Sequence, residues 1–273
     1  MKNNISGLLL LGTLTLTIIG FLFWQNNHIV SRALEIRNRE IPESFQGYTI
    51  VHLADLHNKS FGKEQAPLIR AITSAEPDLL VITGDLMDSR RPDPEPVRAL
   101  LEGLPGDLSV VFVTGNHEQA LRNQEDLLNL LSDHGVILLD NRDLTLEEDG
   151  KTITLCGIRD PGTIRLPASM GVREDLPEGY RIALVHRPEF FDTPAADSYH
   201  LLLSGHAHGG QIRLPFLGGL AAPGQGFFPA YTSGLYHRDD TSLMVSRGLG
   251  NSLFPFRIFN RPDLPVLKLF PEK

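Results

Sequence analysis

The chain has 273 residues, of which 41% are hydrophobic and 21% are charged, and this suits one catalytic domain with a substantial core and a short appendage. Its formal net charge of −8 argues against a protein that binds nucleic acid by bulk electrostatics, so we expect no nucleic-acid partner. The single cysteine, Cys156, allows no internal disulfide and argues against a structural zinc site built on thiolates.

The chain begins with an element that we interpret as a membrane anchor. Residues 8–24 form an uncharged apolar run, which as a helix is about 25 Å long and reaches the short end of a bilayer span. A cleaved signal peptide is the competing interpretation, but the weak cleavage motif at residues 31–33 lies far beyond the apolar run. A buried core helix is a third interpretation.

The charges that flank this run leave its orientation open. Lys2 precedes it, whereas Arg32, Arg37 and Arg39 follow it, so the excess of positive charge that marks the cytoplasmic side gives no firm answer. We favour the extracytoplasmic face for the remainder of the chain, held at the membrane by the N-terminal helix.

The expected domain organisation has three parts. Residues 1–24 are the anchor or signal, residues 25–47 are a polar connector, and residues 48–273 are the catalytic domain. At Tyr48 the pattern changes to alternating strands and helices.

The first half of this domain predicts a sheet that is covered on both faces. Residues 48–55, 78–85 and 109–116 are near-continuous apolar runs, typical of parallel strands, and amphipathic helical stretches lie between them. A fourth strand is expected at residues 135–140. The second half is richer in strands, which we expect at residues 153–158, 181–186, 200–206, 242–248 and 265–270. The economical architecture is an α/β fold in which a second sheet packs on the first.

Polar residues follow directly on these strands, so we expect them to converge on one edge of the sheets. They are Asp55, His57, Asp85, Asn116, His186, His206 and His208. Carboxylate, imidazole and amide oxygen together suit Mn²⁺, Fe²⁺ or Zn²⁺, whereas all-oxygen sets favour Mg²⁺ or Ca²⁺. We therefore predict two divalent metal ions, with Mn²⁺ favoured. Two such ions about 3.5–4 Å apart can activate one water and clamp phosphoryl oxygens, so hydrolysis of phosphate esters is the natural reaction.

The same segments resemble the calcineurin-like metallophosphoesterase superfamily, whose pattern is D-x-H, G-D-x-x-D, G-N-H-D/E, a lone H and G-H-x-H. All five blocks are present in this order, within about residues 48–270. The resemblance implies a four-layer αββα sandwich. It also implies one metal held by Asp55, His57, Asp85 and His208, and a second, bridged through Asp85, held by Asn116, His186 and His206.

The resemblance assigns two further residues to catalysis. His117 would protonate the leaving alkoxide or orient the phosphate, and Asp88 would fix the orientation of His117. Glu118, the last residue of its motif, is expected to start a helix or support the site rather than bind metal.

Within the superfamily, the chain is similar to a membrane-associated bacterial branch of YkuE-like and YaeI-like phosphodiesterases. The likeness rests on residues 205–216, on residues 246–251 and on the apolar N-terminus. Ala54 and Ala207 stand where this branch often has Ser and Thr, and neither position supplies a ligand. The likeness implies a phosphodiesterase or pyrophosphatase that acts at the membrane on phospholipid or lipid-linked substrates, such as UDP-2,3-diacylglucosamine.

Other functions stay open on the sequence alone. The protein can be a phosphohydrolase of soluble nucleotides or phosphoproteins, or a non-catalytic scaffold that keeps the metal site; no obligate protein partner is evident. The loops at residues 159–180 and 214–236 should shape substrate choice, an apolar groove favouring an acyl chain and a polar one a headgroup or nucleotide.

Some residues have a structural interpretation. We expect His52, His134, His200 and His237 to be structural, because they fall in no motif. A phosphate-binding role for Arg213, Arg247 and Arg257 is the less favoured interpretation of these arginines.

Overall fold

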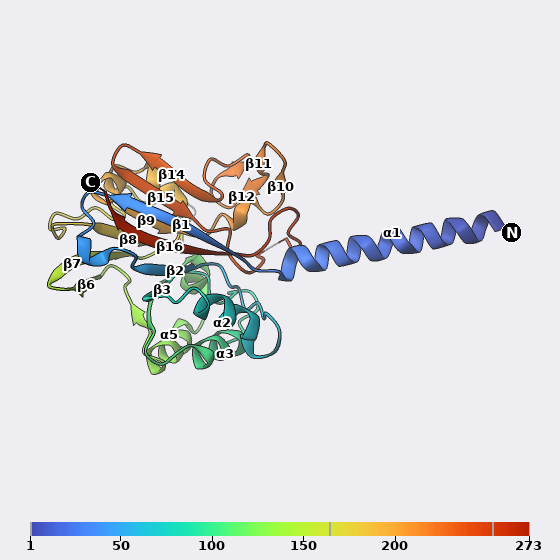
Figure 1. Cartoon of the computed structure of the whole chain (residues 1–273), viewed down its shortest axis with the longest axis horizontal. Helices are drawn as coiled ribbons and strands as arrows, with labels where there is room; N and C mark the ends of the chain where they lie inside the picture. Colours follow the sequence, from blue (N-terminus) through green and yellow to red (C-terminus); the bar gives the residue numbers. More distant parts are fainter. Residues whose placement is uncertain (1, 164, 253, 273) are drawn as a thin grey trace.

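The computed structural model describes residues 2–163, 165–252 and 254–272. Figure 1 shows a head built on two sheets, from which one long helix, α1 (Lys2–Asn27), projects. Within the described residues, Gly7–Asn27 is the one helical stretch long and apolar enough to cross a membrane, and it is exposed along its apolar window. The core-helix interpretation is therefore wrong, whereas an anchor and a signal sequence are both compatible with this helix.

The first sheet has six strands in the spatial order β1-β16-β2-β3-β4-β5. They are β1 (Val30–Asn38), β2 (Thr49–Leu53), β3 (Leu79–Thr83), β4 (Ser109–Val113), β5 (Ile137–Leu138) and β16 (Asp263–Pro271). β2 to β5 run parallel, β16 is antiparallel to β2, and β1 is parallel to β16. Every residue of β2 and β3 is buried, which explains why their sequences lack alternation.

Helices cover the outer face of the first sheet (Figure 1). They are α2 (Ala66–Thr73), α3 (Glu95–Gly103) and α5 (Gln124–Asp133), with the short α4 (Asn116–Ala120) after β4 and the 3-10 helices η1 (Glu43–Phe45) and η2 (Lys63–Gln65) in the connections. The apolar stripes of α2, α3 and α5, which include Ile72, Leu100 and Leu131, pack on Val51 and Ile82 of the sheet. The helices thereby form the first layer of the sandwich.

The second sheet also has six strands, in the order β14-β15-β9-β8-β7-β6. They are β6 (Asp143–Glu148), β7 (Lys151–Ile158), β8 (Arg181–Val185), β9 (Leu201–Ser204), β14 (Gly234–Arg238) and β15 (Thr241–Val245). The four central strands are parallel, and β14 and β6 pair antiparallel at the edges. Leu155, Ile182 and Leu203 pack against Ile50 and Val81 of the first sheet, so the main core lies between the sheets.

The outer face of the second sheet carries 3-10 helices in place of regular α-helices. Phe190 of η3 (Pro188–Asp192) and Ala196 of η4 (Pro194–Ser198) pack on Ala183 and Val245. The predicted mixed α/β fold with two packed sheets is confirmed, and its fourth layer is thinner than the first.

Two segments differ from the sequence-based expectation. Residues 25–47, expected to be a polar connector, contain β1, which pairs with β16 along its whole length. The strand predicted at residues 265–270 belongs to the first sheet, because it inserts between β1 and β2. The folded head therefore begins before Tyr48.

The loop at residues 214–236, expected to shape substrate choice, forms short hairpins rather than a layer. Its strands are β10 (Arg213–Leu214), β11 (Gly218–Gly219), β12 (Ala221–Ala222) and β13 (Gly226–Phe227), and the 3-10 helix η5 (His208–Gly210) precedes them. These hairpins lie on the side of the head from which α1 leaves (Figure 1).

Candidate metal centre

The predicted ligands lie where parallel strands of both sheets end. Asp55 follows β2, Asp85 follows β3 and Asn116 follows β4, whereas His186 follows β8 and His206 follows β9. Because the carboxyl ends of parallel strands meet at one edge, each sheet contributes a row of loops. The two rows meet at one end of the sandwich, where the predicted ligands come together.

One cluster consists of Asp55, His57 and His208, all buried. The Nε2 atoms of His57 and His208 are 3.2 Å apart. Nε2 of His208 is 3.9 Å from Oδ1 of Asp55. Donor atoms that bind one ion at about 2.0–2.3 Å lie roughly 3–4 Å from one another, so this spacing fits a metal site.

A second cluster consists of Asp85, His186 and His206, with Asn116 beside it. Nε2 of His186 is 3.2 Å from Oδ2 of Asp85, 3.2 Å from Oδ1 of Asn116 and 3.1 Å from Nδ1 of His206. Nδ1 of His186 lies 2.7 Å from the carbonyl oxygen of Thr83, to which it must donate. Nε2 of a neutral His186 therefore carries a lone pair and faces two oxygen acceptors, on Asp85 and Asn116.

Asp85 joins the two clusters. Its Oδ2 is 3.2 Å from Nε2 of His186 and 3.5 Å from Nε2 of His57. Its Oδ1 accepts a hydrogen bond of 2.9 Å from the backbone N–H of His117. The structure thus brings all seven sequence-predicted ligands together, with one carboxylate between two sets of imidazoles.

The backbone at this centre is held in conformations that favour glycine. Five of the seven predicted ligands have positive φ, namely Asp55 (51°), His57 (47°), Asp85 (54°), His206 (64°) and His208 (47°). A left-handed conformation costs on the order of 1–2 kcal/mol for a residue with a side chain. Such strain persists where surrounding structure imposes it, and it is common at functional sites.

Two motif glycines explain how the loops approach so closely. A Cβ on Gly84, whose φ is 86°, would lie 2.6 Å from Nδ1 of His186. A Cβ on Gly115 would overlap Oδ1 of Asp85. Both positions therefore need glycine for space, and Gly84 also needs it for its conformation.

Burial keeps three of the histidines neutral, and in each of them the ring nitrogen that takes no part in the cluster contacts is unpaired within the described part of the chain. Nδ1 of His57, Nε2 of His206 and Nδ1 of His208 are buried and have no hydrogen-bond partner among the described residues. Burial lowers the pKa of His57 to about 4 and holds the pKa of His206 and His208 well below the usual range. These imidazoles are therefore neutral at pH 7, the form that binds metal.

Asp55, Asp85 and His186 are buried close together, and burial and mutual interaction shift their pKa values. Burial raises the pKa of Asp55 to about 7. Burial acts in the same direction on Asp85, but the charge and hydrogen bond of His186 outweigh it and hold the pKa of Asp85 well below its usual range. For His186, burial acts to lower the pKa, and Asp85 and Asp55 raise it to about 10. A cation at this position would take the place of the His186 proton that Asp85 now stabilises.

His117 lies next to the first cluster. Its ring centroid is 4.5 Å from that of His57, and its Nδ1 accepts a hydrogen bond of 3.1 Å from the backbone N–H of Ser89. Oδ1 of Asp88 is 3.3 Å from the same nitrogen, but Asp88 also binds Arg90 through two side-chain hydrogen bonds of 3.0 Å. Asp88 can bind this nitrogen only when it carries a proton, so the backbone of Ser89 orients the neutral ring and Asp88 the protonated one. The sequence did not indicate the part of Ser89.

Glu118 supports the loops of the site, as the sequence analysis expected. Its fully buried carboxylate accepts hydrogen bonds from the backbone N–H groups of Asp85 (2.7 Å), Met87 (3.1 Å) and Gly115 (2.8 Å). One side chain thus ties the loop after β3 to the loop after β4. Burial raises its pKa to about 7.

The three candidate phosphate-binding arginines differ in what they contact. Arg257 is fully buried and donates to the carbonyl oxygens of Gly250 and Arg247, so it is structural. Arg247 pairs with Asp263 at 3.2 Å, and Arg213 donates to the carbonyl oxygen of Gly209. The structural interpretation is favoured for all three.

Sequence reasoning missed an acidic residue near the centre. Both carboxylate oxygens of Glu189 are buried and have no hydrogen-bond partner within the described residues. A Cβ on Gly224 would overlap Oε1 of Glu189 and would lie 4.0 Å from Nε2 of His206. Glu189 follows no motif, and the only local signal was its position three residues after His186.

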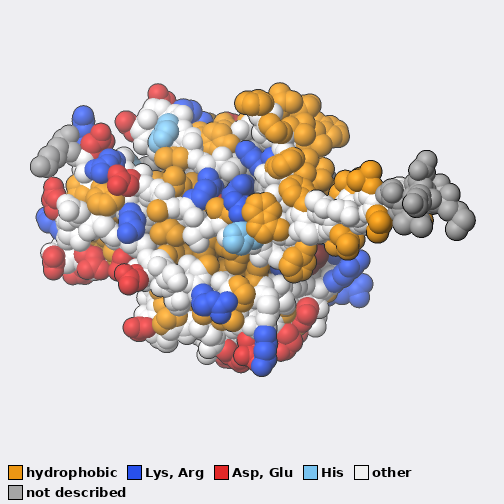
Figure 2. All heavy atoms as spheres, turned by 45° about the vertical axis from the view of Figure 1, so that its right-hand side comes forward, with side chains coloured by type: hydrophobic (Ala, Val, Ile, Leu, Met, Phe, Trp, Pro, Cys, Tyr) orange, Lys and Arg blue, Asp and Glu red, His pale blue; other side chains and the backbone are white. Residues whose placement is uncertain are grey.

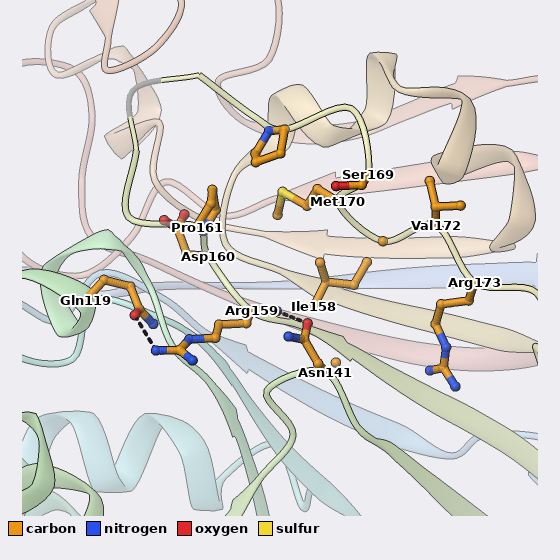
Figure 3. A pocket seen from close by; sticks show the side chains of 13 residues that line it. Gln119, Asn141, Ile158, Arg159, Asp160, Pro161, Ser169, Met170, Val172 and Arg173 are labelled. Carbon is orange, nitrogen blue, oxygen red and sulfur yellow. Dashed lines mark hydrogen bonds between the residues drawn. The ribbon is translucent and has the colours of Figure 1, made fainter.

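Two cavities flank α4, the helix that begins with Asn116 and His117. One, of about 620 Å³, lies against the loop of residues 157–173; its lining is mostly polar and includes Gln119, Asn141, Arg159, Asp160 and Ser169 (Figure 3). The other, of about 830 Å³, is lined by apolar residues and three arginines: Met87, Pro92, Pro94, Ala120, Leu121, Leu127, Leu130, Arg90, Arg98 and Arg122, with Ser89, Asn123 and Asp126. A bound substrate therefore has a polar and an apolar space available.

Comparisons with known proteins agree with this arrangement. The family model of the calcineurin-like phosphoesterases matches residues 48–210. The metallophosphoesterase YkuE of Bacillus subtilis is 31% identical over 242 residues, which cover 86% of this chain and 83% of that protein. The phosphodiesterase YaeI of Escherichia coli is 26% identical over 81% of this chain and 82% of its own length. A transmembrane protein with metallophosphoesterase domain from Danio rerio is 30% identical over 86% of this chain and 56% of its own length.

Proposed function

This chain belongs to the calcineurin-like phosphoesterase family and is a metal-dependent hydrolase of phosphoric esters, and we propose that it is a membrane-anchored phosphodiesterase or pyrophosphatase with a dinuclear centre. The observation that carries the dinuclear proposal is the place of Asp85. Its Oδ2 lies within 3.5 Å of Nε2 of His57 and within 3.2 Å of Nε2 of His186, one from each cluster. Asp55, His57 and His208 would complete one site, and Asn116, His186 and His206 the other.

The donor set supports a borderline divalent ion, and we propose Mn²⁺, with Fe²⁺ and Zn²⁺ as alternatives. When bound, the two ions would activate the attacking water and offset the charge of the phosphoryl group. The protein's own groups supply proton transfer and orientation. As an imidazolium, His117 would donate its Nε2 proton to the leaving oxygen and become neutral, with its Nδ1–H directed at Oδ1 of Asp88, 3.3 Å away. In the neutral ring whose Nδ1 accepts from Ser89, the backbone N–H of Ser89 holds the ring instead.

We propose phospholipids or lipid-linked diphosphates, such as UDP-2,3-diacylglucosamine, as the substrate class. Two features support this. The apolar α1 would hold the head where such substrates are. The 830 Å³ cavity, which can take an acyl chain, is lined by Ser89, and Ser89 contacts His117. Its arginines, Arg90, Arg98 and Arg122, suit an anionic headgroup.

A soluble nucleotide substrate is the second candidate, and the polar 620 Å³ cavity favours it. This cavity contains Gln119, two residues after His117, and Asp160, which pairs with Arg187 at 2.6 Å. Arg159 and Gln119 are joined there by a hydrogen bond of 2.8 Å (Figure 3). In a lipid-linked nucleotide the same cavity would hold the base and sugar.

The full-length chain in detergent tests the reaction with bis-p-nitrophenyl phosphate. We expect activity to vanish on chelation, to return with Mn²⁺ and to be absent in Asp85→Ala. Substrates then separate the candidates: UDP-2,3-diacylglucosamine in mixed micelles should be cleaved in preference to UDP-glucose and to a phosphopeptide. Preference for a soluble substrate would favour the second candidate, and inactivity with two ions bound would favour a scaffold.

The side of the membrane is part of the same proposal. We place the head on the extracytoplasmic face, and trypsin added to intact spheroplasts should then digest it. Protection until the cells are broken would place the head in the cytoplasm.

A further inference from the structure

We propose that exposed apolar loops around the base of α1 form a bilayer-docking surface that holds the mouth of the metal centre against the lipid interface. This inference rests on α1 being a membrane span, as proposed above, but not on the identity of the substrate. Its occupant is the interfacial region of the same bilayer that α1 crosses.

The surface is an aromatic collar made of seven side chains: Phe216, Leu217, Phe227, Phe228, Phe254, Phe256 and Phe259. All are exposed, for example Phe227 by 77% and Phe228 by 62%. Figure 2 shows hydrophobic side chains gathered where α1 joins the head and over the neighbouring loops. Large exposed apolar patches on a protein head mark an interaction surface.

Contacts with the last turns of α1 fix the level of this collar. The rings of Phe21 and Phe259 are 5.6 Å apart in an edge-on arrangement. Oδ1 of Asn26 accepts hydrogen bonds from the backbone N–H of Arg257 (3.0 Å) and from Nδ2 of Asn251 (3.1 Å). The loop that carries three of the collar side chains is therefore attached to the helix end.

The end of α1 also has the composition of a membrane interface. Trp24 lies in its last turn, and the guanidinium of Arg261 is 4.6 Å from the centre of the Trp24 indole. Tryptophan and arginine prefer the headgroup level, where an apolar ring and a charged group are both satisfied. If Trp24 lies at that level, Phe259 and its neighbours lie there too.

The backbone of the collar shows that local folding does not account for these side chains. Phe216, Phe228 and Phe259 have positive φ, of 68°, 52° and 51°. Bulky residues rarely adopt this conformation, and glycine would relieve it. An exposed phenylalanine contributes no packing to the core of the head that would offset the cost of its backbone conformation. We therefore infer that its side chain contacts an external partner.

The collar is joined to the metal centre by the chain itself. The hairpins that carry Phe216, Phe227 and Phe228 follow directly on His208 and η5. Gly224 lies between them, and a Cβ there would be in ordinary van der Waals contact with Nε2 of His206, at 4.0 Å. Docking of the collar therefore places this wall of the metal centre at the headgroup level, where a phosphorylated headgroup can reach it without leaving the bilayer.

A single-cysteine label in the full-length chain tests the docking. The native Cys156 is buried, and burial raises the pKa of its thiol to about 12, so an NBD maleimide will react with a cysteine introduced at the surface. Phe227→Cys is the reporter. Val172→Cys is the control, because Val172 is also apolar and 61% exposed but precedes Arg173, which pairs with Asp143 of β6 at the far edge of the second sheet.

In phospholipid nanodiscs, we expect the label at position 227 to emit at shorter wavelength and to be quenched by lipids brominated in the acyl chain. The label at position 172 should report water. Equal, water-like emission at both positions would overturn the proposal. Protection of position 227 from iodide without quenching by brominated lipid would also overturn it, because a protein partner or a second copy would then cover the collar.

A double variant, Phe227→Ser with Phe228→Ser, links the collar to catalysis. With hexadecyl p-nitrophenyl phosphate in vesicles, we expect hydrolysis to fall about five- to tenfold. With soluble bis-p-nitrophenyl phosphate, the rate should be unchanged. Equal rates on the vesicle substrate would contradict the role of docking in catalysis. Inactivity of the parent chain on both substrates, with a label still inserted at position 227, would reject the proposed function and leave the docking surface standing.

Discussion

Nδ1 of His186, at the end of a strand in the second sheet, donates a hydrogen bond of 2.7 Å to the carbonyl oxygen of Thr83, at the end of a strand in the first. This bond fixes the ring and directs Nε2 toward Asp85 and Asn116. A metal-binding histidine commonly donates its other nitrogen in this way, which makes the free nitrogen a better ligand. The bond thus joins the two sheets and sets the geometry of the proposed second metal site.

His186→Ala should remove one metal ion from the centre. We expect the affinity of that site for Mn²⁺ to fall by more than about 100-fold, since loss of a ligand costs more than loss of its supporting group. Metal content after dialysis, measured by mass spectrometry, tests this. His52→Gln is the matched control. His52 is equally buried, and its Nε2 lies 2.8 Å from the hydroxyl oxygen of Thr83, but it belongs to neither metal cluster. Two ions bound to His186→Ala would contradict the assignment.

Gly115→Ala should abolish turnover while Gly106→Ala leaves it intact. A Cβ at position 115 would overlap Oδ1 of Asp85 and would lie 2.9 Å from Cε1 of His186, so it must displace the Asp85 carboxylate. A Cβ at position 106 meets no atom within 4 Å. Displacement of about 1 Å at a reacting centre can cost about 100-fold in rate. Hydrolysis of bis-p-nitrophenyl phosphate at saturating Mn²⁺ measures the difference, and a Gly115→Ala variant as active as Gly106→Ala would show that the loop adapts.

His117→Ala should retain both metal ions and lose about 10²–10⁴-fold in turnover, the contribution of a positioned general acid. Metal content and kcat are measured on the same preparation. The loss should be smaller for a substrate with a p-nitrophenyl leaving group than for one with an alkyl leaving group, because a good leaving group needs less protonation. His134→Ala is the control, since His134 binds the carbonyl oxygen of Leu130 at the end of α5. Unchanged turnover on the alkyl substrate would remove His117 from the acid role.

How the sequence predicted the centre can be traced to particular residues. Asp55, Asp85 and Asn116 each follow a largely apolar strand, and parallel strands end at the same edge, so their convergence follows from local pattern plus one rule of topology. The contribution of His186 and His206 from a second sheet required the additional assumption that the sheets pack with these edges together. The local pattern of each strand does not establish that packing by itself.

What the sequence did not predict depends on contacts between distant segments. β1 alternates between half-buried and exposed residues over most of its length, a strand signal that its charged residues Arg32, Glu35 and Arg37 concealed. Its partner β16 lies about 230 residues later, as in the pair Val30 and Asp263, and no local pattern encodes that pairing. The contacts of Glu118 with two loops are likewise visible only in three dimensions.

Glu118→Gln should weaken the site without removing a ligand. The carboxylate accepts three backbone hydrogen bonds, whereas an amide presents one oxygen and turns its NH₂ group toward N–H groups that need an acceptor. We expect a loss of about 1–3 kcal/mol in the free energy of unfolding and weaker metal binding. Urea unfolding and Mn²⁺ titration measure the two effects. Glu102→Gln, which removes the same charge from an exposed residue of α3, is the control, and equal effects would indicate that loss of charge matters rather than the three hydrogen bonds.

Asp263→Asn should lower stability at neutral pH and flatten its dependence on acid. Burial acts to raise the pKa of Asp263, but its hydrogen bonds of 2.8 and 2.5 Å with Arg32 and the charge of Arg247 outweigh this and lower the pKa below 3.8. A carboxyl whose pKa is lower in the folded state stabilises the fold above its unfolded pKa, and this contribution is lost as the pH falls through the folded value. We therefore expect the parent chain to lose stability below about pH 4 and the variant to lose less there. At pH 7 the variant should be less stable by about 3 kcal/mol, because two arginines lose a buried partner. Urea unfolding in a non-ionic detergent between pH 2 and pH 7 measures both effects.

Glu35→Gln is the control for Asp263→Asn. It removes an exposed ion pair with Arg37 and should change neither the stability at pH 7 nor its dependence on acid. Parallel pH profiles for Asp263→Asn and the parent chain would show that Asp263 does not link acid to unfolding.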